Sequence, residues 1–184
     1  MQVRRVIDGR RVRGEQRRNE LLRATLAVIE RDGVAGVSHR AVAATADVSV
    51  ASVTYHFATL DELLVAALTW AAEDLAAELH ARGSEWGARP ADELARLIEH
   101  SVVRRRGRTL ALYELYLYAA RRPELRPAAG AWLEPLTEIA RAFTADPQKA
   151  RLLVAALDGL LMQALIGARE VDRADFAALL EVLR

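Results

Sequence analysis

Hydrophobic residues recur every three to four positions along most of this chain, which is the spacing of one face of an α-helix. Leu22, Leu26 and Ile29 form the first such stripe, in a segment that we expect to be helical over residues 15–31 and to stop before Gly33. No segment shows the strict alternation that is typical of a strand. The pattern therefore predicts an all-α chain of about nine helices.

Capping signals mark where the later helices begin. The segment from Thr59 to Glu62 has the form of a capping box, so a long helix is expected to follow over residues 60–81. Gly83 and Gly87 are expected to break the chain. Further helices are expected over residues 90–106, between Gly107 and Pro123, over residues 127–144 and 146–166, and from Asp172 onward.

The stretch from Ser38 to Phe57 predicts two short helices joined by a tight turn. Ser38 and Ser49 are each placed to cap a helix, and Asp47 lies where the turn needs a left-handed residue. Val53 and Phe57, four positions apart, would hold the second helix to the body. The opposite face then stays free, and its small or hydrogen-bonding side chains are typical of a helix in a DNA major groove: Val50, Ser52, Tyr55 and His56.

The order of these signals resembles the tetracycline-repressor (TetR) family of bacterial transcription regulators. The resemblance implies an N-terminal three-helix helix-turn-helix domain over residues 17–63 and a C-terminal helical bundle for ligand binding and dimerisation over residues 64–184. About a quarter of the chain carries it, at Leu21–Leu26, Gly33, Ser38, Val42–Ala43, Val48–Ser49, His56–Phe57 and Asp61–Leu63.

Three positions depart from the family pattern. Asp47 stands where the family usually has Gly, and Thr54 stands where it usually has Tyr, although Tyr55 follows at once. Leu60 stands where the family often has a Lys that contacts phosphate. The turn should survive these changes, but that phosphate contact is absent.

Arg40 is the strongest candidate for reading a base. The resemblance implies that this position can reach one, and an Arg side chain can bond both acceptors on a guanine edge. A phosphate contact or a plain surface charge remains an alternative for Arg40. The full set of expected DNA-contacting residues is Ser38, His39, Arg40, Ser49, Val50, Ala51, Ser52, Tyr55 and His56.

Charge is unevenly distributed along the chain. Residues 1–60 carry ten Arg and six acidic residues, whereas the remainder carries sixteen basic and nineteen acidic residues. A basic N-terminal third is the expected footprint of a module that binds phosphate. Residues 1–16 form a basic arm that we expect to be mobile away from DNA; it could enter a minor groove, serve only solubility or be a cloning remnant.

Several classes of protein are disfavoured by what the sequence lacks. It has no cysteine, which excludes disulfides and thiolate metal sites. It shows no Gly-rich phosphate loop, nucleophile elbow or His-Glu-x-x-His, so we expect no enzyme activity, metal or cofactor. No apolar run is long enough to span a bilayer, and no signal peptide is evident, so a cytoplasmic protein without membrane contact is expected.

The segment from Leu152 to Ile166 provides the argument for assembly. Only Asp158, Gly159 and Gln163 interrupt its apolar sequence, and a helix that is apolar on all sides must be covered on all sides. We expect one side to pack on its own domain and the other on a second copy, as the family's last two helices do. The alternative is the central helix of a monomeric bundle. The expected interface residues are Leu153, Leu157, Gly159, Leu160, Ala164, Phe176 and Leu180.

Aromatic and polar side chains of the C-terminal helices could line a ligand cavity, or the aromatic ones could simply belong to the core. Cavities for small molecules are mostly apolar with a few placed polar groups, which favours a small apolar or aromatic effector. The expected lining residues are Trp70, Ser101, Tyr113, Glu114, Tyr116, Trp132 and Gln163.

The leading hypothesis is a ligand-responsive, homodimeric transcription repressor. Its partners would be double-stranded DNA with a palindromic operator, a small-molecule effector and a second copy of the chain. A helical protein-interaction module that uses the hairpin for protein contacts, and an all-α enzyme, are the two competing hypotheses.

Overall fold

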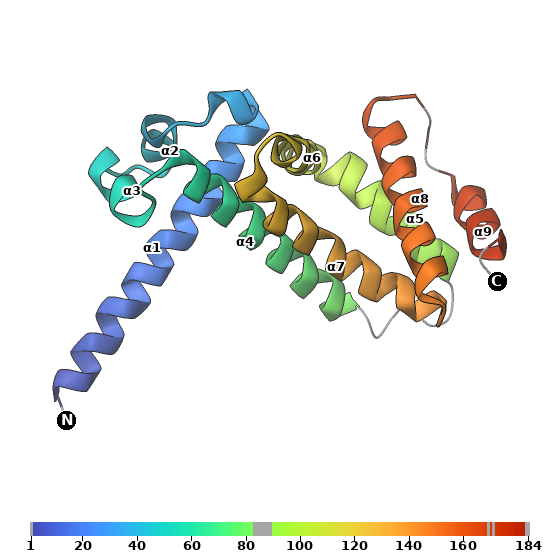
Figure 1. Ribbon diagram of the computed structural model, residues 1–184, viewed down its shortest axis with the longest axis horizontal. Helices are drawn as coiled ribbons and strands as arrows, with labels where there is room; N and C mark the ends of the chain where they lie inside the picture. Colours follow the sequence, from blue (N-terminus) through green and yellow to red (C-terminus); the bar gives the residue numbers. More distant parts are fainter. Residues whose placement is uncertain (1, 83–89, 169, 171, 183–184) are drawn as a thin grey trace.

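The computed structural model describes residues 2–82, 90–168, 170 and 172–182, and these residues form helices without a β-strand. The all-α prediction is therefore confirmed (Figure 1). The α-helices are α1 (Gln2–Asp32), α2 (His39–Thr45), α3 (Val50–His56), α4 (Leu60–Arg82), α5 (Pro90–Glu99), α6 (Arg106–Ala120), α7 (Arg126–Phe143), α8 (Pro147–Leu165) and α9 (Arg173–Val182).

Helix α1 is longer than the sequence pattern predicted. Residues 2–16 were expected to form a mobile basic arm, but the structure places them in the first turns of α1, whose N-terminal half projects from the body (Figure 1). No proline interrupts residues 1–32, and an established helix extends at little cost per residue. The hydrophobic stripe of Leu22, Leu26 and Ile29 is buried as predicted.

The main core joins the N-terminal helices to the middle of the chain. Leu21 and Leu22 of α1 pack in one cluster with Leu64 and Leu68 of α4 and with Leu115 of α6. Because α4 runs without a break from the hairpin into this core, the expected domain boundary at residues 63 and 64 falls inside one helix. Any movement of α4 must therefore be shared by both parts of the chain.

The junction between α5 and α6 differs from the prediction. A helix was expected to run to residue 106 and to stop at Gly107, but α5 ends at Glu99 and a π-helical turn, η3 (His100–Arg104), precedes α6. Gly107 instead lies in the first turn of α6, where a Cβ would stand 2.2 Å from Oε1 of Glu30. The glycine therefore permits α6 to approach α1 closely. The expected break at Gly83 and Gly87 lies outside the described residues.

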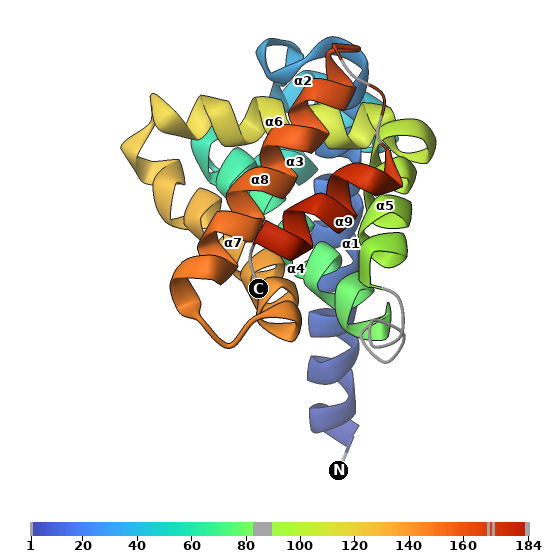
Figure 2. The same ribbon diagram turned by 90° about the vertical axis from the view of Figure 1, so that its right-hand side faces the viewer.

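Helices α8 and α9 close the end of the molecule opposite the α2–α3 hairpin, and they lie side by side there (Figure 2). Asp146 caps α8 as its sequence predicts, accepting hydrogen bonds from the backbone N–H groups of Gln148 and Lys149. Phe176 of α9 is fully buried in a second cluster with Leu94 and Ile98 of α5. That contact attaches the last helix to its own chain.

Candidate nucleic-acid interface and ligand cavity

Local hydrogen bonds hold the hairpin of α2 and α3 in the predicted form. The Ser38 hydroxyl accepts a hydrogen bond from the backbone N–H of Ala41 at 3.1 Å, and the Ser49 hydroxyl accepts one from Ser52 at 3.2 Å. Asp47 adopts a φ of 53°, the left-handed conformation that the turn requires. Each cap supplies an acceptor to a helix end that would otherwise lack one, so each helix begins at a defined residue.

The recognition helix α3 is buried on one face and exposed on the other. Val53 and Phe57 are 0% and 2% exposed, whereas Val50 and Tyr55 are 43% and 86% exposed. Ala51 and the base-reading candidate Arg40 of α2 are also exposed, and Ser52 is partly so. The exposed side chains of this face are therefore free to contact a partner, while the buried face holds α3 to the body.

His39 has a structural contact that the sequence did not predict. It was expected to contact DNA, but its Nε2 lies 3.1 Å from the carbonyl oxygen of Phe57. This hydrogen bond joins the start of α2 to the end of α3. Similarly, the Thr54 hydroxyl donates to the carbonyl oxygens of Val50 and Ala51 within α3.

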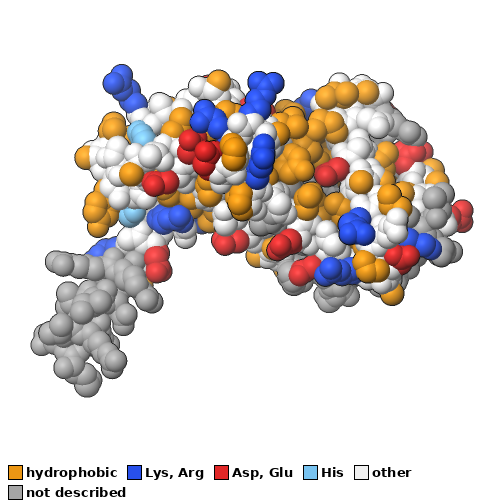
Figure 3. All heavy atoms as spheres, in the orientation of Figure 1, with side chains coloured by type: hydrophobic (Ala, Val, Ile, Leu, Met, Phe, Trp, Pro, Cys, Tyr) orange, Lys and Arg blue, Asp and Glu red, His pale blue; other side chains and the backbone are white. Residues whose placement is uncertain are grey.

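His56 lies at the end of α3 beside two arginines of α1. Burial lowers the pKa of its imidazole, and the positive charges of Arg18 and Arg17 lower it further. The neutral imidazole is therefore favoured. The guanidinium of Arg18 lies over the ring of Phe57 at 5.0 Å, so α1 adds positive charge at this end of the molecule, where Figure 3 also shows histidine and exposed hydrophobic side chains.

The junction between hairpin and bundle is a capping box, as the sequence predicts. The Thr59 hydroxyl accepts a hydrogen bond from the N–H of Glu62 at 3.1 Å, and the Glu62 carboxylate accepts one from the N–H of Ala58 at 2.8 Å. The start of α4 is thereby attached to the last residues of the hairpin.

A cavity of about 100 Å³ lies on the other part of α4, between α4, α5, η3, α6, α7 and α8. Most of its wall is apolar, and its polar groups come from α4, η3, α6 and α8. The lining residues are Ala71, Asp74, Leu75, Glu78, Leu97, Ile98, His100, Ser101, Arg105, Arg108, Thr109, Leu112, Tyr113, Leu136, Leu157, Asp158 and Leu161.

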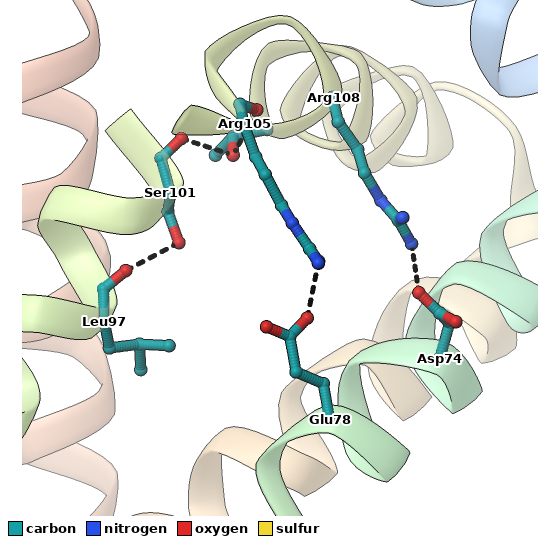
Figure 4. A network of polar contacts seen from close by, with 7 residues as sticks. Asp74, Glu78, Leu97, Ser101, Arg105 and Arg108 are labelled. Atoms are coloured by element: carbon teal, nitrogen blue, oxygen red, sulfur yellow. Dashed lines mark hydrogen bonds and ion pairs between the residues drawn. The ribbon is translucent and has the colours of Figure 1, made fainter. Parts of the chain in front are cut away.

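Two ion pairs connect α4 with the η3–α6 region along this cavity. Arg105 pairs with Glu78, and Arg108 pairs with Asp74 (Figure 4). The Ser101 hydroxyl donates to the carbonyl oxygen of Leu97 at 2.9 Å, so it is used within its own helical turn. The acidic charges that α4 contributes to the cavity wall are therefore already balanced by arginines.

A second polar contact in the cavity joins α6 to α8. The Tyr113 hydroxyl donates a hydrogen bond to Oδ1 of Asp158 at 2.7 Å. Burial raises the pKa of the Asp158 carboxyl, and the Tyr113 hydrogen bond partly opposes that effect. Burial, together with the neighbouring Asp158 carboxylate, also raises the pKa of the Tyr113 hydroxyl. The tyrosine is therefore a neutral donor to a half-buried acid.

Of the expected lining residues whose side chains the structure describes, Ser101 and Tyr113 line this cavity. Trp70 instead lines a separate, more open hollow beside the hairpin, together with Arg18 and Thr59, and Tyr116 packs against the main core. Neither residue therefore lines this cavity, because an aromatic residue at helical spacing does not reveal which side of its helix faces a cavity.

The polar candidates Glu114 and Gln163 also lie elsewhere. Oε2 of Glu114 accepts a hydrogen bond from the backbone N–H of Val34 at 2.9 Å, and Gln163 lines a groove between α8 and α9. The side chain of Trp132 lies outside the described part of the chain. The sequence did not predict that Asp74, His100, Arg108 and Asp158 line the cavity. The one available signal was Asp158, a charged residue within an otherwise apolar helix.

The expected dimer surface on α8 and α9 is also corrected. Leu153 and Phe176 are fully buried and Ala164 is nearly so, while Leu157 faces the cavity, so these four residues pack inside their own chain. Leu160 and Leu180 are half-buried against neighbouring helices. The exposed stripe of α8 consists of Leu152, Ala155, Gln163 and Ile166, with Leu152 and Ile166 at 55% and 69% exposure, while Gly159 is partly exposed in the groove between α8 and α9.

Within the described residues, no helix is long and apolar enough to cross a membrane. The described residues also hold no group of three or more His, Asp or Glu side chains placed to bind a metal ion.

Comparison with known proteins covers both parts of the chain. Residues 21–67 match the family "Bacterial regulatory proteins, tetR family", and residues 87–184 match "Tetracyclin repressor-like, C-terminal domain". No curated protein matches the sequence.

Solved structures are similar over most of the chain. The multidrug binding protein EbrR in complex with ethidium is 42% identical, with 91% of this chain and 98% of that chain covered and a TM-score of 0.79. EbrR in complex with proflavin is 42% identical, with 91% and 99% covered and a TM-score of 0.74. SCO1917 from Streptomyces coelicolor A3, a member of the TetR family, is 43% identical, with 91% and 97% covered and a TM-score of 0.78. With a capped helix-turn-helix at one end and a matching helical bundle at the other, this chain belongs to the TetR family of bacterial transcription regulators.

Proposed function

We propose that this protein is a homodimeric repressor that binds a palindromic operator and is released from it by a small aromatic effector. One observation carries the proposal: α4 starts at the capping box beside the hairpin and also supplies Asp74 and Glu78 to the cavity wall. An effector that moves this wall must act on the DNA-reading hairpin through a single continuous helix. The proposed division is a reading domain over residues 17–63 and an effector and dimerisation domain over residues 64–184.

The DNA-binding part of the proposal rests on exposure. Arg40, Val50, Ala51 and Tyr55 project from the α2–α3 hairpin, while the opposite face of α3 is buried. Arg40 would read a guanine, Val50 and Ala51 would contact a thymine methyl, and Tyr55 would bond a phosphate. A regulator that acts on bacterial DNA in this way would work in the cytoplasm.

The dimer would form through the exposed stripe of α8. Leu152 and Ile166 mark its two ends, and a Cβ placed on Gly159 would meet no atom within 4 Å. That open space would allow the helix of a second copy to approach closely. Two hairpins related by the resulting two-fold axis would bind half-sites about one helical turn, roughly 34–36 Å, apart.

The effector part of the proposal rests on the size of the cavity. Its volume of about 100 Å³ is well below the roughly 300–1,000 Å³ of ordinary ligand pockets. An aromatic molecule such as the dyes that EbrR binds would have to separate α4, α6 and α8 in order to enter. Binding would then favour a conformation different from the one that holds DNA, which is the condition for release.

Selection of bound fragments from a random DNA pool tests the proposal directly. The wild-type protein should enrich a palindrome, and Arg40→Ala should relax the base preference at one position in each half-site at a cost of about 1–3 kcal/mol. If Arg40→Ala weakens all sequences equally, Arg40 contacts only phosphate. Failure to enrich any sequence would overturn the repressor proposal.

Release of the selected DNA is the second arm of this test. Tetraphenylphosphonium is a suitable aromatic probe because, unlike ethidium and proflavin, it does not intercalate into DNA. A tenfold loss of operator affinity corresponds to about 1.4 kcal/mol of coupling between the two sites.

A further inference from the structure

The acidic groups of the α4–α6–α8 cavity outnumber its arginines. Its wall contains three carboxylates, from Asp74, Glu78 and Asp158, and two guanidinium groups, from Arg105 and Arg108. The arginines pair with Glu78 and Asp74 (Figure 4), so the third carboxylate is left without a positive partner.

Asp158 has an unusual environment for a charged side chain. It lies in the middle of α8, between cavity-lining Leu157 and Leu161, and among the described residues it accepts a hydrogen bond from the neutral hydroxyl of Tyr113 at 2.7 Å. A half-buried carboxylate without a cation costs free energy, and burial accordingly raises its pKa. An asparagine could accept the same hydrogen bond from Tyr113 without that cost. Support of the fold therefore does not explain why an acid stands here.

A residue that lines the same cavity also has a buried polar atom without a hydrogen-bond partner among the described residues. Nε2 of His100, in the π-helical turn η3, is buried and forms no hydrogen bond with any described residue. Buried polar atoms are nearly always paired with protein, water or ligand. The other charged groups of the wall are paired with each other. An unpaired ring nitrogen and an unneutralised carboxylate beside the apolar part of the wall are complementary to a molecule that combines aromatic surface, positive charge and a hydrogen-bonding group.

We propose that the cavity selects aromatic cations and that the carboxylate of Asp158 meets their positive charge. This inference rests on the proposed function only in taking the cavity as the effector site. The Tyr113 hydroxyl orients the carboxylate, and Nε2 of His100 bonds a polar group on the ligand. The positive charge of the ligand takes the place of the missing third arginine, so binding neutralises the cavity.

A pair of dyes with one ring system separates charge from shape. Proflavin is cationic at neutral pH, and acridine has the same three fused rings but is uncharged there. Their affinities for DNA-free protein would be measured by calorimetric titration, with wild type, Asp158→Asn and the control Glu134→Gln. Glu134 is an exposed carboxylate on α7, so its replacement makes the same change in charge away from the cavity.

Wild type and Glu134→Gln should bind proflavin at least tenfold more tightly than acridine, a difference of about 1.4 kcal/mol. Asp158→Asn should lose that preference and leave acridine binding within about twofold of wild type. Its urea unfolding midpoint should equal or exceed that of wild type, since a buried charge has been removed. A purely structural role would instead lower that midpoint.

Two results would overturn the proposal and are distinguishable from each other. If proflavin and acridine bind equally in all three proteins, Asp158 does not select charge, although the proposed repressor function stands. If neither dye binds and tetraphenylphosphonium does not release the operator, the effector part of the proposed function fails as well.

Discussion

Replacing Glu114 by alanine should loosen the contact between the effector bundle and the DNA-reading end of the molecule. Oε2 of Glu114, on α6, accepts a hydrogen bond from the backbone N–H of Val34 at 2.9 Å. Val34 begins the short turn after α1 and follows Gly33, which has a φ of 74°. Glu114 also follows Tyr113 directly, so one turn of α6 contacts both the cavity and the helix-turn-helix domain.

The size of the effect follows from the type of bond and its exposure. A hydrogen bond to a charged group contributes roughly 1.5–3 kcal/mol when protected from water. Because the Glu114 carboxylate is exposed, solvent screening should reduce this to about 1 kcal/mol. With a urea dependence of about 2 kcal/mol per molar, the unfolding midpoint of Glu114→Ala should fall by about 0.5 M.

Urea unfolding followed by circular dichroism would measure this shift, at one protein concentration because dimerisation contributes to apparent stability. Glu114→Gln keeps an acceptor oxygen and should lose less than Glu114→Ala. The exposed Glu134→Ala should lose almost nothing. An unfolding midpoint for Glu114→Ala that matches Glu134→Ala would refute the reasoning. In an assay of release from the operator, the Glu114→Ala protein should need more effector than wild type for the same loss of DNA affinity.

Three further predictions concern the dimer, the cavity and the turn. Gly159→Arg should give a monomer in sedimentation experiments with its helix content unchanged, since the position faces open space; an unchanged dimer would exclude this face. Burial raises the pKa of the Asp158 carboxyl in the folded protein. Its contribution to stability is therefore complete at pH values below the pKa of this carboxyl in the unfolded chain, and it is lost as pH rises through the pKa in the folded protein. In urea titrations, the advantage of Asp158→Asn over wild type should therefore vanish as pH falls through the acid range. Asp47→Ala should cost about 1 kcal/mol of unfolding free energy because of the left-handed backbone, whereas Asp47→Gly should be tolerated; equal losses in both would contradict this.

Local signals in the sequence determined much of the fold. The capping side chains of Ser38, Ser49, Thr59 and Asp146 each accept a hydrogen bond from a backbone N–H group within four residues. The left-handed conformation of Asp47 is likewise a local feature of its turn. Such hydrogen bonds depend on side chains and backbone that are close in sequence. For the same reason the buried and exposed faces of α3 could be predicted from a spacing of four residues.

Contacts between distant segments decided the cavity and the exposed face of α8. Tyr113 and Asp158 are 45 residues apart, and Glu114 and Val34 are 80 apart, so no local pattern connects them. An apolar helix such as α8 shows that it must be covered, but not which side its own chain covers. That depends on how α5, α7 and α9 pack against it, which buried Leu153 and left Leu152 exposed. The sequence by itself determined the helices and the DNA-reading hairpin, and the tertiary structure decided which side chains meet, because that choice is made by packing between segments far apart in the chain.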